Sequence, residues 1–182
     1  MNNLDKIIIH GTDVSWQKLR DQFSSVNQFH KLRDFPLSRL GFWVGYHRLI
    51  TGGKNYKCKY DSEEGAHTIG QNFTSLGVCV GFDGDIEYPH PDDYVLLQKQ
   101  VWAWQDMYQI PDSQVFFHRS FNTLKTCPGS LLGVEWMAEL LRRTPRLKPE
   151  EQEEKQKEIL RQKISLLEKI INLYLQIKSL LK

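Results

Sequence analysis

The stretch Lys6-Ile7-Ile8-Ile9-His10 is the part of the sequence from which the fold can be worked out. Three consecutive isoleucines between polar neighbours are typical of a short buried β-strand, and His10 stands at its end. Residues 114–117 form a second short apolar run that leads into His118 in the same way. The two histidines can converge only if these strands are neighbours in one sheet, so we expect that pairing.

The rest of the first 141 residues alternates between strand-like and helix-like patterns. Apolar residues predict a central buried strand over residues 76–82 and another strand over residues 42–50, before the turn-forming pair Gly52-Gly53. Apolar spacings of three and four predict helices over residues 92–108 and 130–141. A further helix, capped by Ser15 and running to about Phe29, would carry Trp16, Leu19, Phe23 and Val26 on one face. Alternating strands and helices indicate an α/β or α+β layer fold.

Composition divides the chain into two parts. All glycine, proline, tryptophan, phenylalanine, histidine and cysteine residues lie within residues 1–149, whereas residues 150–182 are mainly leucine, isoleucine, lysine, glutamate and glutamine. Hydrophobic residues make up 40% of the chain, which is enough to bury a core. We therefore predict a globular domain over residues 1–145, followed by a linker and one amphipathic helix over residues 146–182.

The apolar residues of this C-terminal helix form two adjacent seams with spacings of three and four. Together they make a wide apolar face that a lone helix would not leave exposed to water. Copies of the same helix, the globular domain or a partner protein, and a membrane surface could each cover it. Homo-oligomerisation, as in a coiled coil, is favoured, and membrane contact is the least favoured because the polar face carries both signs of charge.

Charge, hydropathy and cysteine content exclude several classes of protein. The formal net charge of +2 is spread over both parts, so there is no electrostatic case for nucleic-acid binding. No run of about 18 apolar residues predicts a transmembrane helix. The N-terminal residues lack the features of a secretory signal, so we expect cytoplasmic synthesis without a signal peptide. Three cysteines are too few for a disulfide framework, and their odd number leaves at least one free thiol.

The two strand-end histidines and Cys127 could form a metal site. Cys127 follows His118 by nine residues in the sequence Thr-Cys-Pro-Gly, where Pro128 and Gly129 would turn the backbone and hold the thiol. Two imidazoles and one thiolate are good zinc ligands, and a catalytic zinc site has three protein ligands and a fourth position for water. The alternative is that the histidines are structural and that Cys127 is a small buried hydrophobic residue.

The order of short motifs along the chain adds to this pattern: Ile-Ile-Ile-His10, Val-Gly-Tyr46-His47, Gly-Ala-His67 with Asn72, Ser75-Leu-Gly-Val78, Phe-His118-Arg119 and Thr-Cys127-Pro-Gly129. This series resembles the zinc-dependent N-acetylmuramoyl-L-alanine amidases, a family that includes phage endolysins and peptidoglycan recognition proteins. The resemblance covers about residues 5–143. It implies an α/β fold with a central mixed β-sheet, flanking helices and a zinc ion in a surface groove.

The resemblance also implies roles for individual residues. The zinc ligands would be His10, His118 and Cys127, the catalytic residues Tyr46 and Lys125, and the substrate-binding residue His67. The chain departs from the family at Gly11, where many members have a second histidine or a small polar residue. It also lacks the Gly-Arg pair that the family usually shows within the stretch that corresponds to residues 52–62.

The implied activity is hydrolysis of the amide bond between N-acetylmuramic acid and L-alanine in peptidoglycan, with Zn²⁺ as cofactor and lysis of the cell wall as its result. Zinc would supply a Lewis acid, and Lys125 would supply positive charge to the developing oxyanion. Tyr46 would hydrogen-bond to the attacking water or the leaving amine, and the sequence leaves open whether Tyr46 or Lys125 handles the proton. Such an antibacterial enzyme would reach the wall after holin-type release, as phage endolysins do.

Other interpretations stay open. The same fold could serve as a non-catalytic peptidoglycan-binding module, although such recognition proteins commonly lack the cysteine ligand. The C-terminal helix could be the functional part of an assembly protein. Taken singly, Tyr46 could be a core aromatic residue, Lys125 a solvated loop charge and His67 a structural histidine. We expect His47 to be structural, and His30 and His90 to lie on the surface.

Overall fold

The computed structural model describes residues 4–143, 160, 161, 163–165, 167 and 169. The chain divides into two units, Met1–Arg142 and Arg143–Lys182. In the second unit the described residues from 160 onward are helical. The predicted domain boundary at residues 145–146 and most of the predicted C-terminal helix lie outside the described residues. Among those that are described, no helix has the length and apolarity needed to span a lipid bilayer.

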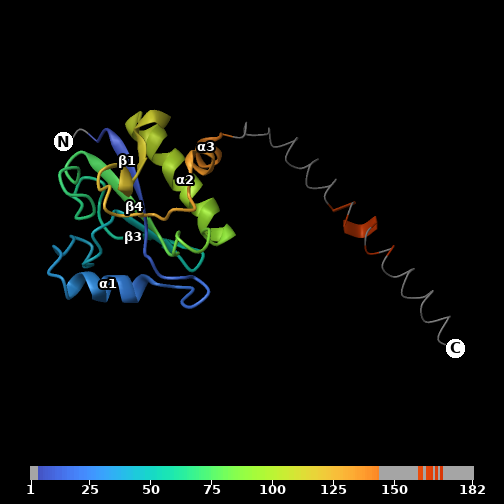
Figure 1. Cartoon of the computed structure of the whole chain (residues 1–182), viewed down its shortest axis with the longest axis horizontal. Coiled ribbons are helices and arrows are strands. Elements are labelled where there is room, and N and C mark those ends of the chain that lie inside the picture. Colours follow the sequence, from blue (N-terminus) through green and yellow to red (C-terminus); the bar gives the residue numbers. More distant parts are fainter. Residues whose placement is uncertain (1–3, 144–159, 162, 166, 168, 170–182) are drawn as a thin grey trace. The chain divides into compact units, whose positions relative to one another are not determined.

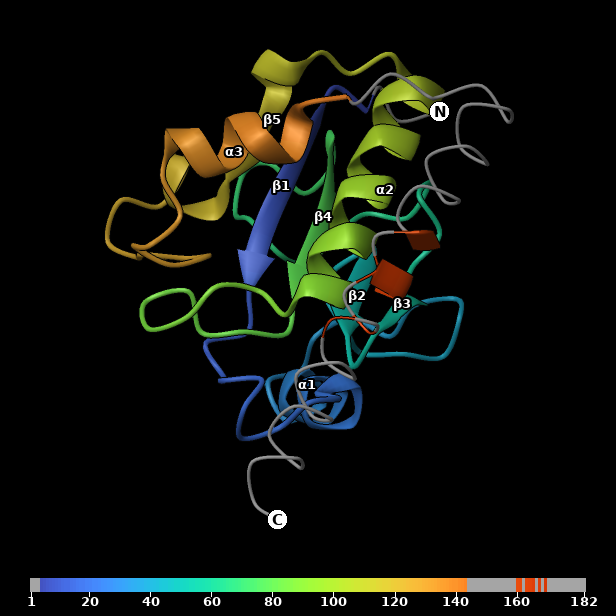
Figure 2. The ribbon, with the colours of Figure 1, turned by 90° about the vertical axis from the view of Figure 1, so that its right-hand side faces the viewer.

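In the described part of the chain, five strands form one mixed sheet with the order β3-β2-β4-β1-β5. Figure 1 labels β1, β3 and β4 of this sheet, and Figure 2 labels all five strands. The strands are β1 (Lys6–Gly11), β2 (Arg48–Thr51), β3 (Lys54–Lys57), β4 (Ser75–Val80) and β5 (Val115–Phe117). β1 is parallel to β4 and β5, β2 is parallel to β4, and β3 is antiparallel to β2. The expected central mixed sheet is confirmed, as are the strands expected around residues 6–9, 76–82 and 114–117.

One face of the sheet is covered by α2 (Pro91–Tyr108) and α3 (Val134–Leu141). Figure 2 shows α2 lying across this face. The period-two alternation of β1 directs Ile7 and Ile9 into the main core, which they share with Trp104 of α2. Burying an aliphatic side chain of this size stabilises a fold by roughly 1.5–3 kcal/mol. The main core therefore lies between the sheet and these two helices.

The opposite face of the sheet carries the residues that alternate with this core. His10 of β1 and Cys79 of β4 are partners in register on neighbouring strands, and both are buried. A smaller apolar cluster around Cys79 includes Phe23 and Val26 of α1 (Phe23–Lys31). The first predicted metal ligand thus points away from α2 and towards the side of α1.

The prediction that a helix starts at Ser15 is wrong, because α1 begins at Phe23. The Ser15 hydroxyl donates instead to the Glu87 carboxylate, at 3.0 Å. The Gln22 side-chain amide donates to the backbone carbonyls of Val14 at 2.8 Å and Leu19 at 3.1 Å. The two bonds from Gln22 occupy backbone carbonyl groups that would accept hydrogen bonds within a helix, so the segment forms turns.

Two other expected elements are shorter than the sequence pattern suggested. Of residues 42–50, only the part from Arg48 onward is strand, because the backbone N–H groups of Trp43 and Gly45 donate to side chains of other segments. The last helix begins at Val134 and not at residue 130, where the backbone N–H donates to the Asp85 carboxylate. The helix expected over residues 92–108 is confirmed as α2. Two short 3-10 helices, Asp112–Gln114 and His118–Ser120, flank β5.

Candidate metal centre and its groove

His10 and His118 are brought together by the pairing of their strands. β1 and β5 are parallel neighbours in which Ile9 lies opposite Phe117, so each histidine follows at the same end of the sheet. The centroids of the two imidazole rings lie 4.5 Å apart. The expectation that these two strands are neighbours is therefore confirmed.

Cys127 completes a group of three potential ligands. Its Sγ lies 3.8 Å from Nδ1 of His10, and the ligand atoms of His10, His118 and Cys127 all lie within 4.8 Å of one another. Bond lengths of about 2.0–2.3 Å place the ligands of a tetrahedral zinc ion roughly 3.3–3.8 Å apart. A small contraction of the group would seat zinc, and two imidazoles with one thiol are a donor set that zinc prefers. The residues present therefore fit this metal.

Burial governs the protonation of these three groups. It lowers the pKa of His10 well below 6.5, and burial together with the charge of Lys125 lowers the pKa of His118. Both rings are therefore neutral near neutral pH, as metal ligands must be. Burial raises the pKa of the Cys127 thiol to about 11. Because zinc binds the thiolate, this thiol would release its proton as the metal binds.

The turn that carries Cys127 is packed tightly against two glycines. A Cβ atom on Gly11 would lie 2.8 Å from the carbonyl oxygen of Pro128, and one on Gly84 would lie 2.1 Å from the same oxygen. A side chain at either position would displace the turn. The departure from the amidase pattern at Gly11 thus has a steric reason, because the residue after His10 must leave room for the turn.

Hydrogen bonds hold the same turn in place. The Arg119 guanidinium donates to the carbonyls of Gly129 at 2.8 Å and Thr126 at 3.2 Å. The Asp85 carboxylate accepts from the backbone N–H of Ser130 at 2.7 Å and from the Thr126 hydroxyl at 2.8 Å. These charge-assisted bonds fix the loop that presents the thiol to the two histidine rings.

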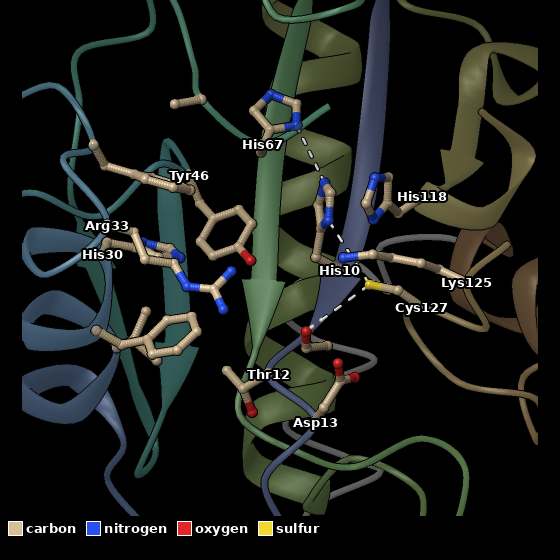
Figure 3. Close-up of a pocket in the computed structure, with 15 residues that line it drawn as sticks. His10, Thr12, Asp13, His30, Arg33, Tyr46, His67, His118, Lys125 and Cys127 are labelled. Carbon is tan, nitrogen blue, oxygen red and sulfur yellow. Dashed lines mark hydrogen bonds between the residues drawn. The ribbon is translucent and has the colours of Figure 1, made fainter. Parts of the chain in front are cut away.

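The three potential ligands line a groove of about 440 Å³, and Tyr46 and Lys125 line it with them (Figure 3). The ring centroids of Tyr46 and His10 lie 5.0 Å apart. Burial raises the pKa of the Tyr46 hydroxyl well above 10. Lys125 is exposed, and its positive charge acts on all three potential ligands. The fold thus brings the ligands and both expected catalytic residues into one groove.

His67 also lines the groove, although its own side chain is buried. Its Nδ1 lies 3.1 Å from Nε2 of His10 and 3.0 Å from the Thr68 hydroxyl. Its Nε2 lies 3.4 Å from the Ser75 hydroxyl. Burial lowers the pKa of His67 to about 3, so the ring is neutral. The structure therefore places His67 directly against a potential metal ligand, whereas its expected contact with substrate stays a prediction.

The expectation that His30 lies on the surface was wrong. His30 is buried and lines the groove, its Nδ1 accepts the backbone N–H of Gly45 at 3.1 Å, and its ring stacks on Phe35 at 4.2 Å. Burial lowers the pKa of His30 to about 4. A signal was present in the sequence, because His30 lies four residues after Val26 and seven after Phe23, on the same helix face.

Sequence reasoning also left out two charged residues of the groove, Asp13 and Arg33. Both come from loops, where no periodic pattern could reveal them. His90 is only partly exposed, because its Nδ1 caps α2 by accepting the N–H of Asp92 at 3.3 Å. His47 is buried and both of its ring nitrogens bond to backbone groups, as expected of a structural histidine.

No protein-family model matches the sequence, and no curated protein sequence matches it either. Several solved structures are similar to the chain. The N-acetylmuramoyl-L-alanine amidase LysC from Clostridium intestinale URNW is 21% identical with a TM-score of 0.62, over 78% of this chain and 88% of that one. The Ph2119 endolysin from Thermus scotoductus MAT2119 bacteriophage Ph2119 is 20% identical with a TM-score of 0.59, over 77% and 86%. A mutant of Drosophila PGRP-LB in complex with tracheal cytotoxin is 22% identical with a TM-score of 0.62, over 80% and 86%. The chain therefore has the fold that N-acetylmuramoyl-L-alanine amidases share with peptidoglycan recognition proteins.

Proposed function

We propose that the chain is a zinc-dependent N-acetylmuramoyl-L-alanine amidase, which hydrolyses the amide bond between N-acetylmuramic acid and L-alanine in peptidoglycan. One observation carries the proposal: His10, His118 and Cys127 converge in the groove of a domain that has the fold of such amidases. Two imidazoles and one thiol would leave a fourth zinc position for water, which is the arrangement of a catalytic site.

Different residues of the groove have different roles in amide hydrolysis. When bound, zinc supplies a Lewis acid that polarises the carbonyl group and acidifies water. Lys125 donates to the carbonyl oxygen as negative charge develops there, while water adds to the carbonyl carbon. Tyr46 hydrogen-bonds to the attacking water and orients it. The carbon–nitrogen bond then breaks, and the proton that the attacking water loses is passed through Tyr46 or Lys125 to the leaving nitrogen of L-alanine.

A second candidate is a non-catalytic peptidoglycan-binding module. It is favoured by the structural similarity to peptidoglycan recognition proteins, one of which was solved in complex with tracheal cytotoxin. Cys127 favours the enzyme, because a binding module needs no thiol beside two neutral histidines. The presence of Tyr46 and Lys125 in the same groove favours it further.

Digestion of purified cell walls tests the proposal. We expect the full chain to release new N-terminal alanine without new reducing sugar, and we expect a chelator to stop the release until zinc is restored. The Cys127→Ala variant should bind walls but contain less zinc and release no alanine. Wall binding without alanine release by the zinc-loaded protein would support the binding module instead. Alanine release that resists the chelator would contradict a role for zinc.

The proposal extends to the rest of the chain through the sequence pattern. Residues 1–145 would form the amidase domain, and residues 146–182 a linker with an oligomerising helix. The enzyme would reach the wall from the cytoplasm after holin-type permeabilisation of the membrane. A processed, secreted form in intact cells would contradict that route.

A further inference from the structure

The two ring nitrogens of His10 face different partners. Nδ1 lies 3.8 Å from Sγ of Cys127, whereas Nε2 lies 3.1 Å from Nδ1 of His67 (Figure 3). The Thr68 hydroxyl is a more distant neighbour of Nε2, at 3.4 Å. A ring nitrogen that binds a metal ion is unprotonated, and the other nitrogen of the neutral ring then carries the proton. Because Nδ1 is the atom on the side of Cys127, the Nε2–H group of His10 is the one that points at His67.

We propose that His67 is a positioning residue, which accepts the Nε2–H of His10 and so keeps Nδ1 of His10 free to bind the metal. The inference rests on the metal site proposed above. It gives His67 a task within the protein, different from the substrate contact expected from the sequence. Partners of this kind orient the ligand ring, and losing one weakens metal affinity about 10- to 100-fold.

The hydrogen bonds beyond His67 fix the direction of this arrangement. The Gln71 carbonyl can only accept, so the Ser75 hydroxyl donates to it, at 2.7 Å. The hydroxyl oxygen of Ser75 can then accept from Nε2–H of His67 at 3.4 Å, which leaves Nδ1 of His67 unprotonated and able to accept. Both ring nitrogens of His67 are thus occupied inside the protein, which leaves neither of them free for a substrate.

Packing holds the ring of His67 in this orientation. A Cβ atom on Gly65 or Gly77 would lie 2.4 Å or 2.5 Å from its Cδ2, so the ring fills the space that the two glycines leave. The Asn72 side chain accepts the backbone N–H groups of His67 at 2.9 Å and Thr68 at 2.8 Å. A side chain fixed at both its ring and its backbone is pre-organised, as a residue that orients a metal ligand has to be.

Metal affinity tests the inference without using turnover. Full-length His67→Leu removes the acceptor, full-length His67→Asn keeps an acceptor oxygen near the position of Nδ1, and full-length His10→Ala removes the ligand itself. Competition with a chromophoric chelator gives the affinity for Zn²⁺, and the absorption spectrum of bound Co²⁺ reports the ligand geometry. We expect zinc binding to weaken about 10- to 100-fold in His67→Leu, with an altered cobalt spectrum, and to recover largely in His67→Asn.

The outcomes separate this inference from the proposed function. Wild-type zinc affinity in a folded His67→Leu, or equal weakening in His67→Leu and His67→Asn, overturns the positioning role while His10→Ala still loses the metal. Zinc binding that survives His10→Ala shows instead that the proposed metal site is wrong. If His67→Leu does not fold by circular dichroism, isotope-edited NMR of the zinc-loaded wild type decides: a proton on Nε2 of His10 supports the inference, and a proton on Nδ1 overturns it.

Discussion

Lys125 is the residue whose removal separates chemistry from metal binding. It is exposed and is not one of the three potential metal ligands, yet its charge acts on all three of them. We expect Lys125→Ala to lower kcat by about 10²- to 10³-fold, the cost of removing one oxyanion donor, and to keep its zinc. The measurement is alanine release from purified walls, with zinc content determined on the same samples. Lys99→Ala, which removes an exposed lysine of α2, is the matched control and should keep its turnover. Unchanged turnover in Lys125→Ala would remove this lysine from the mechanism.

His47 links the stability of the fold to pH. It is fully buried, its Nδ1 accepts the N–H of Gly77 at 3.0 Å, and its Nε2 donates to the carbonyl of Glu63 at 2.9 Å. Burial lowers the pKa of His47 to about 4, against 6.5 for an exposed histidine. The unfolded chain therefore takes up the proton first as the pH falls. The stability that this neutral ring contributes is complete above about pH 6.5 and is lost progressively as the pH falls towards 4.

The variant His47→Asn should show a weaker loss of stability in acid. Between about pH 7 and pH 5, the His47 imidazole should account for about 2 kcal/mol of the unfolding free energy that the wild type loses. The variant should not lose this part, because asparagine does not titrate. Urea unfolding of the zinc-free proteins at both pH values gives the two losses. His10 and His30 are common to both proteins and cancel in the comparison, and His67, whose pKa burial lowers to about 3, stays neutral in the folded wild type over this range. Equal losses in wild type and variant would contradict the assignment.

The sequence revealed site residues that stand at strand ends but not residues that act through hydrogen bonds to the backbone. His10 lies near the end of the apolar strand β1 and His118 directly follows β5, so local sequence pattern located both of them. Arg119 and Asp85 act on the Cys127 turn through bonds to backbone carbonyl and N–H groups, which leave no trace in residue types or spacing. His30 shows the opposite case, because its helical spacing was visible but a histidine was taken to be a surface residue.

At the scale of elements, the turn that carries Cys127 depends on the loop after β4. A methyl group on Gly84 would meet the Pro128 carbonyl oxygen at 2.1 Å, so Gly84→Ala has to move one of the two loops. We expect Gly84→Ala to cost about 1–3 kcal/mol of stability through overpacking, and to weaken zinc binding about tenfold or more because the thiol moves. Chelator competition and urea unfolding measure the two effects.

Gly133→Ala is the matched control for that prediction. A Cβ atom on Gly133 would meet nothing within 4 Å, although this residue is the N-cap of α3 and alanine is a poorer cap. Its stability should change by no more than about 1 kcal/mol, with unchanged zinc affinity. If Gly84→Ala and Gly133→Ala bind zinc equally well, the packing of the two loops does not position the thiol.

The sequence pattern predicted which helices and strands exist more accurately than it predicted the residues at which they begin and end. The apolar runs of β1 and β4 lie in the parallel part of the sheet and are buried on both faces, and such strands appear as uninterrupted apolar stretches. Residues 42–46 are also rich in large apolar side chains, but the backbone N–H groups of Trp43 and Gly45 bond to the side chains of Asn27 and His30 and not to a neighbouring strand. Composition cannot show which side chain a backbone group bonds to, and before α1 the backbone carbonyls of Val14 and Leu19 accept from the Gln22 side chain.

At the scale of the whole molecule, the site exists because the strand order brings three distant segments together. β1 lies between β4 and β5, which places the residue after β5 beside His10, more than a hundred positions away in the sequence. The motifs that contain His10 and His118 lie at the ends of β1 and β5, and Ser75-Leu-Gly-Val78 forms most of β4. The groove between them, with Asp13 and Arg33 on its sides, follows only from the three-dimensional arrangement of the loops.

The C-terminal part of the chain should govern assembly and not chemistry. Within the part of the chain that the structure describes, the residues that line the groove run from His10 to Cys127, whereas the two apolar seams lie within residues 150–182. We expect a chain without residues 150–182 to have a smaller mass in solution than expected from the deletion alone, because the seams favour self-association. Its turnover per domain on purified walls should stay within about twofold, since the metal ligands and the loops that hold them are intact.

Light scattering coupled to size-exclusion chromatography measures this change in mass, and alanine release on the same samples measures turnover. The combined substitution Leu160→Glu, Ile164→Glu and Leu167→Glu in the full chain is the matched control, because it charges one part of the apolar face without shortening the protein. It should reduce the mass in the same way as the deletion, since burying a carboxylate between apolar helices is strongly unfavourable. If the deletion abolishes turnover and leaves the oligomeric state unchanged, the C-terminal part serves the amidase domain directly and does not drive assembly.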